Sequence, residues 1–91
     1  MTLSSGTDRS GAITVGGTAQ VLAAANPDRR GLTGQNISAG DLWINETGGT
    51  AAVDGTGSYK IPTNSMFSIE TVFAISIIGA TTAQKFTATE W

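Results

Sequence analysis

Short runs of apolar and β-branched residues, separated by Gly, Pro and Asn, recur about every ten residues along the chain, a spacing typical of all-β domains. A period of two puts Leu42 and Ile44 on one face of such a strand and Trp43 on the other. The pattern predicts strands over residues 13–15, 18–24, 30–36, 41–45, 51–53, 59–61, 66–69, 73–78 and 83–91. Helix signals are weak, because the best candidate, residues 20–25, is too short to nucleate a helix.

Strands of this length and spacing are typical of a β-sandwich or a jelly-roll-like barrel, and the sequence leaves both architectures open. We therefore predict an all-β fold with a small single domain over residues 12–91. The most apolar run, residues 73–78, is the expected central strand. Residues 46–58 are rich in Gly and Thr and are expected to form a long exposed loop with a brief strand inside it.

The N-terminal segment differs from the rest, because it is mostly polar and shows no strand pattern. We predict an extended N-terminal arm over residues 1–11. A polar chain end normally frays unless it is tied down. We therefore expect the arm from Thr2 to Ser10 to lie across a neighbouring subunit, with packing on its own domain as the alternative. Thr2 and Leu3 are candidate interface residues on this interpretation.

Composition narrows the possible chemistry. Gly, Ala, Thr and Ser make up half of the chain, which contains no Cys and no His. Disulfides, Cys- or His-ligated zinc and the Ser-His-Asp triad are thereby excluded. Only 13% of the residues are charged and the net charge is −2, which argues against a nucleic-acid partner. The longest apolar run, residues 72–78, is too short to span a bilayer, so we expect no membrane contact.

Carboxylates offer the remaining route to catalysis or metal binding. A pair such as Asp41 and Glu46 resembles the two acids of a glycosidase, but a sandwich of this size offers little cleft to shift the pKa of one of them. Asp54 is the one carboxylate among residues 48–58 of the Gly-rich loop, whereas calcium loops need several. We therefore expect no catalytic residue, no cofactor and no metal site.

Two arginines, Arg29 and Arg30, follow a turn at residues 26–28. As interface residues they would bind acidic groups of a partner protein through bidentate contacts. The alternative is that one of them pairs with Asp28 or Asp41 of its own chain and leaves the other solvated, and we favour this for at least one arginine.

Two tryptophans are the largest side chains. Trp91 is a candidate interface anchor, because aromatic residues dominate the energetics of interfaces. For Trp43, core and interface positions remain open alternatives. Trp43 with Asn45 also crudely fits a glycan-binding platform, which requires a solvent-exposed Trp43, whereas an interface requires the aromatic side chains to be buried at contacts.

Three short motifs follow one another along residues 16–31: Gly16-Gly17-Thr18-Ala19-Gln20, then Ala24-Ala25-Asn26, then Arg29-Arg30-Gly31. Residues 35–38, 41–45 and 48–52 continue the pattern, and residues 78–88 close it. In combination these motifs resemble the small β-rich structural proteins encoded in the virion gene clusters of tailed bacteriophages. The resemblance covers the chain apart from the N-terminal arm and is weakest over residues 64–71.

The resemblance implies a non-enzymatic virion component. The first expectation is a capsid cement or decoration protein that binds the head exterior and stabilises the shell. A tail, spike or connector accessory protein, or a glycan-binding module on the virion, is the alternative. The implied partners are the major capsid protein and copies of itself as a homotrimer, because three-fold sites are the usual location of such proteins. The implied location is the surface of the phage particle, after synthesis in the host cytoplasm.

Overall fold

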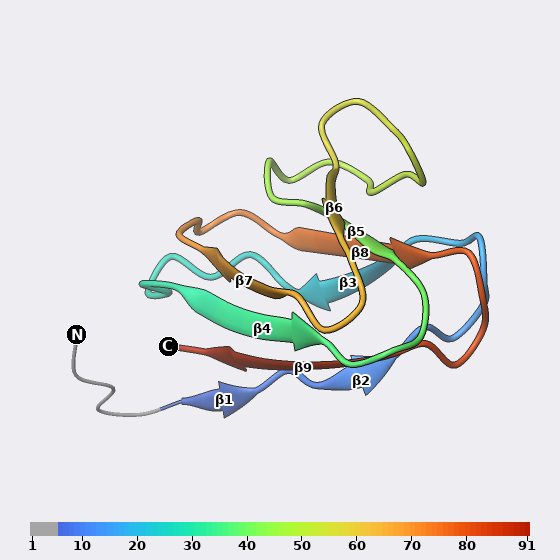
Figure 1. The fold of residues 1–91 in the computed structure, drawn as a ribbon. Coiled ribbons are helices and arrows are strands. Elements are labelled where there is room, and N and C mark those ends of the chain that lie inside the picture. Colours follow the sequence, from blue (N-terminus) through green and yellow to red (C-terminus); the bar gives the residue numbers. More distant parts are fainter. Residues whose placement is uncertain (1–5) are drawn as a thin grey trace.

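The computed structural model describes residues 6–91, which form nine strands and no helix (Figure 1). The strands are β1 (Thr7–Asp8), β2 (Gly11–Ala12), β3 (Gln20–Ala23), β4 (Leu32–Asn36), β5 (Leu42–Asn45), β6 (Tyr59–Ile61), β7 (Met66–Ile69), β8 (Ile75–Gly79) and β9 (Lys85–Glu90). The all-β prediction is confirmed. Seven of the predicted runs coincide with β3 to β9, where β-branched and aromatic residues suit a pleated, half-buried surface.

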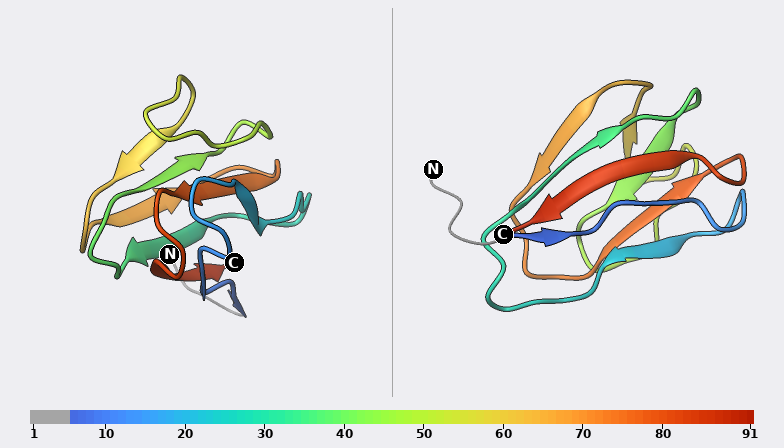
Figure 2. Two further views of the ribbon diagram at one scale, coloured as in Figure 1. Left: turned by 90° about the vertical axis from the view of Figure 1, so that its right-hand side faces the viewer. Right: turned by 90° about the horizontal axis from the view of Figure 1, so that it is seen from below.

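The strands are arranged in two sheets that face each other (Figures 1 and 2). The five-stranded sheet has the order β1–β9–β4–β7, with β2 also pairing with β9, and the four-stranded sheet has the order β3–β8–β5–β6. All these pairings are antiparallel. Two separate sheets define a β-sandwich rather than a barrel. The prediction that the most apolar run is central is confirmed, because β8 lies between β3 and β5.

Side chains at alternate positions of the strands point inward and fill the space between the two sheets. In β9, Phe86 and Ala88 are buried while Lys85 and Thr87 are exposed, which is the period of two expected of a strand with one buried face. The least exposed apolar side chains of this core, all at 1% or less, are Ile13, Leu32, Leu42, Ile44, Ile75 and Ile77. Burying each side chain of this kind contributes roughly 1.5–3 kcal/mol.

One amide side chain, that of Asn36, is fully buried at 0% exposure and ties the two sheets together. Its Nδ2 donates to the carbonyl oxygens of Gly40 and Ile61, both at 2.8 Å. Its Oδ1 accepts from the backbone N–H of Ser38 at 2.9 Å and from the Ser38 hydroxyl at 2.7 Å. All four hydrogen-bonding positions of the amide are therefore used, and β4 of one sheet is linked to β6 of the other.

The predicted strand over residues 13–15 is absent from the described chain. Ile13 is buried in the core although it belongs to no strand: its N–H donates to the Gln84 carbonyl at 2.8 Å, and its carbonyl accepts from the Ala83 N–H at 2.7 Å. The chain then turns at Gly17, whose φ of 80° is in the left-handed region that glycine tolerates. A turn therefore replaces the strand.

The loop over residues 46–58 differs from the expectation of a long exposed loop with a strand at 51–53. No strand forms there, and Ala51 is only 3% exposed. The N–H of Ala51 donates to the hydroxyl of Ser76 on β8 at 2.9 Å. The loop therefore covers part of the outer face of the four-stranded sheet.

The described part of the N-terminal arm pairs with its own domain. β1 aligns Thr7 with Glu90, β2 aligns Gly11 with Phe86, and the N–H of Arg9 donates to the Ala88 carbonyl at 2.8 Å. The expectation that the arm crosses to a neighbouring subunit does not hold for residues 7–10, because the edge of β9 supplies backbone partners within the chain. Thr2 and Leu3 lie outside the described residues.

Candidate functional site

The C-terminus lies at the same end of the sandwich as the β3–β4 and β7–β8 connections, and we call this end the terminal end (Figure 1). Three of the predicted site residues, Arg29, Arg30 and Trp91, come together here. Trp43 does not, because it lies on β5, on the outer face of the four-stranded sheet.

A buried ion pair organises the terminal end. The Arg29 side chain is 0% exposed, and its Nε donates to Glu90 Oε2 at 2.6 Å. Its Nη1 donates to the carbonyl oxygens of Thr71 and Phe73, both at 2.8 Å, and its Nη2 donates to the Ala24 carbonyl. The prediction that at least one arginine pairs within its own chain is confirmed. The predicted partners were wrong, because the carboxylate is that of Glu90.

The second carboxylate oxygen of Glu90 binds the arm. The Nε and Nη2 of Arg9 donate to Glu90 Oε1 at 3.1 and 2.8 Å. Burial by itself would raise the pKa of Glu90, but the hydrogen bonds from Arg9 and Arg29 and the charges of both guanidinium groups hold that pKa below its ordinary value. Glu90 is therefore a carboxylate that joins the arm, the last strand and the β3–β4 connection.

Trp91 packs against its own domain. A side chain at Gly31 would meet the Trp91 indole at 2.6 Å, so the glycine makes room for the ring. The Trp91 carbonyl accepts from the N–H groups of Arg30 and Gly31 at 2.7 and 2.9 Å. The indole N–H lies 3.5 Å from the hydroxyl of Thr33. The ring is half-buried, and its role as an interface anchor stays a prediction.

Exposed apolar side chains lie next to this ion pair. Phe73 is 58% exposed and Val72 is 43% exposed. The Val72 carbonyl accepts from the Asn26 N–H at 2.9 Å, and the Phe73 carbonyl accepts from Arg29. The segment is therefore held by its backbone while its side chains face solvent. We call the exposed side chains of Arg30, Val72, Phe73 and the half-buried Trp91 the terminal-end surface.

Trp43 is 8% exposed and belongs to a second core on the outer face of the four-stranded sheet. It packs with Ile78 and Ala51, and Ala19 lies against them. Of the two positions left open for this residue, the core is the observed one, because residues 46–58 fold over the sheet. A buried indole does not offer the exposed platform that glycan stacking requires.

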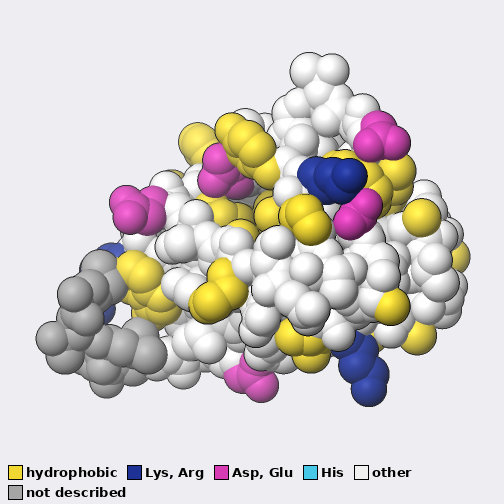
Figure 3. Space-filling view, in the orientation of Figure 1, with side chains coloured by type: hydrophobic (Ala, Val, Ile, Leu, Met, Phe, Trp, Pro, Cys, Tyr) yellow, Lys and Arg dark blue, Asp and Glu magenta, His cyan; other side chains and the backbone are white. Residues whose placement is uncertain are grey.

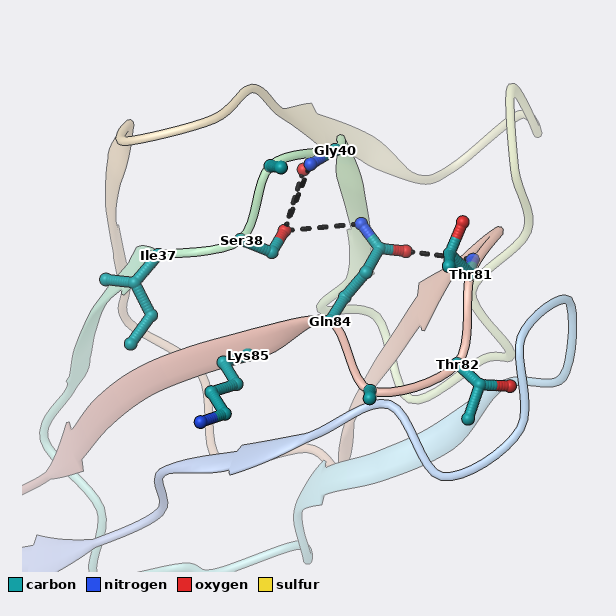
Figure 4. A pocket seen from close by; sticks show the side chains of 9 residues that line it. Ile37, Ser38, Gly40, Thr81, Thr82, Gln84 and Lys85 are labelled. Carbon is teal, nitrogen blue, oxygen red and sulfur yellow. Dashed lines mark hydrogen bonds between the residues drawn. The ribbon is translucent and has the colours of Figure 1, made fainter.

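The opposite end of the sandwich carries a shallow groove of about 460 Å³ between the β4–β5 and β8–β9 connections. Figure 4 shows the Gln84 side chain crossing between Ser38 and Thr81, with Lys85 pointing away from it. The Gln84 amide accepts from the Thr81 N–H at 3.0 Å and donates to the Ser38 hydroxyl at 3.2 Å and to the Asp41 carbonyl at 3.0 Å. The groove's polar groups thus hold two connections together.

Charged side chains are few on the face in Figure 3, and most of that face is uncharged. Apart from the Glu90 cluster, the structure places Lys60 3.4 Å from Asp41. Across residues 6–91, no three Asp or Glu side chains gather closely enough to hold a metal ion. The same residues include no helix with the length and hydropathy of a membrane crossing.

Comparison with known proteins adds no relative: no protein-family model, curated protein or solved structure matches the chain.

The exposed position of Phe73 runs against the sequence pattern. Phe73 has the same parity as Ile75 and Ile77, so the strand pattern predicts that it points into the core. The strand begins only at Ile75, because the Phe73 carbonyl accepts a hydrogen bond from the Arg29 side chain. No local signal reveals this, since the two residues lie 44 positions apart.

Proposed function

We propose that this protein is a non-enzymatic bacteriophage virion component that binds the exterior of the head through its terminal-end surface and stabilises the shell. The observation that carries the proposal is the exposure of Val72 and Phe73 on a segment whose backbone carbonyls accept hydrogen bonds from the buried Arg29, itself paired with Glu90. The resemblance of residues 16–31 and of the later motifs to virion proteins supplies the biological setting. The proposed partners are the major capsid protein and copies of this chain, at the surface of the particle.

Binding has an entropic cost that a pre-formed surface reduces. Aromatic and Arg side chains supply most of the energy of protein interfaces. A surface already held in its bound shape loses little conformational entropy when a partner docks. Because a shell repeats each contact many times, modest contacts add up through multivalency. A small sandwich with a few fixed apolar side chains suits this task.

Cosedimentation tests the proposal. Purified protein is mixed with empty heads that lack it, and isolated tails serve as the parallel sample. Saturable binding to heads at a fixed copy number per capsomer, together with heads that rupture at a higher temperature, is the expected result. Binding to tails alone would reassign the protein to a tail or connector role, and binding to neither would refute the proposal.

A matched pair of variants tests the surface itself. Phe73→Ser removes an exposed apolar side chain at the terminal end, and Val15→Ser removes one that is 54% exposed and lies outside that surface. Burying the rest of Phe73 would contribute about 1–1.5 kcal/mol, so we expect about tenfold weaker head binding for Phe73→Ser. Val15→Ser should bind as the wild type does.

The glycan-binding alternative has less support, because Trp43, its central residue, is only 8% exposed.

A further inference from the structure

The edge of β7 is unpaired and lies outside the terminal-end surface. Among the described residues β7 pairs with β4 alone, and it is the outermost strand of the five-stranded sheet (Figure 2, right). An unpaired strand edge presents N–H and C=O groups that readily accept another strand. Soluble proteins therefore protect such edges with charge, proline, bulges or very short strands.

The other three sheet edges carry such protection. β6 is three residues long, has Lys60 at its centre and is followed by Pro62. β3 shifts register against β8 between Val21 and Ala23. β1 and β2 are two residues each, with Arg9 between them.

Within its own residues β7 has none of these devices, and the nearest charge is that of Glu70, directly after the strand. Its four residues, Met66–Ile69, include no charge and no proline, and they keep an unbroken register with β4. Met66 is 68% exposed. A mostly apolar groove of about 300 Å³ lies between β7 and β6. Its apolar lining includes Ile44, Ile61, Ile69 and Tyr59, which is 62% exposed, and its polar lining residues are Glu46 and Ser68. The bare edge and the groove together are suited to an added strand.

We propose that the β7 edge binds an extended segment of the head protein by strand addition, with apolar side chains at alternate positions entering the groove between β6 and β7. Main-chain hydrogen bonds supply affinity in this mode, and pockets for alternate side chains supply specificity. The inference rests on the proposed function and names the form that the head partner takes.

Two observations favour a head segment over a second copy of this chain. β7 ends at Ile69, three residues before Val72, so its edge runs directly into the terminal-end surface. Antiparallel pairing of β7 with the β7 of a second copy would point the two terminal ends in opposite directions. Only one of the two terminal ends could then face the head. A head segment bound to β7 instead lets the β7 edge and the terminal-end surface contact the same partner.

A matched pair of lysine substitutions tests the edge. Ser68→Lys places a charge on the exposed side of β7, and Thr87→Lys places one on the same face of the sheet at β9, two strands away. Both positions are exposed, and at Thr87 the substitution removes one exposed hydrogen bond, 2.9 Å long, between its hydroxyl and that of Ser10. Both variants should therefore keep a free energy of unfolding close to that of the wild type, which urea titration checks. With empty heads as the probe, we expect about tenfold weaker binding for Ser68→Lys and wild-type binding for Thr87→Lys.

Amide hydrogen exchange on the same heads gives the second measurement. Alternate backbone N–H groups of an edge strand point away from the sheet, so alternate amides of residues 66–69 should become protected when the protein binds. Sedimentation of the free protein completes the test, and the proposal expects no β7-dependent self-association.

Three results would overturn the inference. Wild-type head binding by Ser68→Lys, or unprotected β7 amides on the head, would remove the edge contact. Self-association abolished by Ser68→Lys would show that a second copy occupies the edge. If Ser68→Lys binds heads as the wild type does and Phe73→Ser does not, the strand-addition inference fails and the proposed function stands. If the wild type does not bind heads, the inference and the proposed function both fail.

Discussion

Glu90→Gln is the perturbation that most directly probes the terminal end. Gln keeps the shape of the side chain but removes the negative charge between Arg9 and Arg29. The Arg29 guanidinium, 0% exposed, would then be a buried charge without a counter-ion. Removing one partner of a buried ion pair costs about 3–5 kcal/mol, far more than the net contribution of the intact pair.

The lower part of that range is expected here. Arg29 keeps its hydrogen bonds to the carbonyls of Ala24, Thr71 and Phe73, so we expect a loss of about 3 kcal/mol. A domain of this length has a free energy of unfolding of roughly 5–14 kcal/mol. The loss is therefore a large fraction of the total, and it lowers Tm by roughly 12–24 °C.

Urea unfolding followed by tryptophan fluorescence measures the change, with Arg9→Gln as the control. Arg9 also binds Glu90, but its side chain is 39% exposed, so solvent screens the pair and its loss costs about 1 kcal/mol or less. Glu90→Gln should also weaken head binding, because Arg29 fixes the segment that carries Phe73. A Glu90→Gln variant no less stable than Arg9→Gln would refute the reasoning.

Three further predictions concern pH, the buried amide and the second core. Because the pKa of Glu90 is lower in the folded protein than its ordinary value, its stabilisation is complete above that ordinary value and is lost as pH falls through the folded pKa. Urea titrations across acidic pH should therefore show a slope that Glu90→Gln reduces but does not abolish, since the Ser10 hydrogen bonds also lower the pKa of Asp8. Asn36→Ala leaves buried partners without hydrogen bonds and should lower the free energy of unfolding by about 3 kcal/mol; a loss under about 1 kcal/mol would contradict the proposed link between sheets. Trp43→Ala should cost about 3–5 kcal/mol in the same assay and leave the head affinity of the folded fraction unchanged, whereas a specific loss of binding would place Trp43 in an interface.

Strand positions were predictable because they depend on local alternation. The runs over residues 59–61 and 66–69 coincide with β6 and β7, and the inward side of β9 follows its own pattern. Sheet membership was not predictable, since consecutive strands such as β6 and β7 belong to different sheets. Pairing between strands far apart in sequence decides that choice.

The candidate site was harder to predict because its key contacts are long-range. The carboxylate that binds Arg29 lies 61 residues away, and nearer acids were the natural expectation. The burial of Trp43 depends on the loop at residues 46–58 folding back over its strand, which Gly- and Thr-rich composition does not specify. The exposure of Phe73 likewise follows from a contact with Arg29 and runs against the strand pattern.

Hydroxyl-radical footprinting of the protein on empty heads tests the central claim most directly. It reports the solvent exposure of individual side chains, and Phe73 and Val15 are both well exposed in the free protein at 58% and 54%. The account predicts that oxidation of Phe73 and Trp91 falls sharply when the protein binds heads, while that of Val15 does not change. Undiminished oxidation of Phe73 on saturated heads, or protection of Val15 in its place, would contradict it.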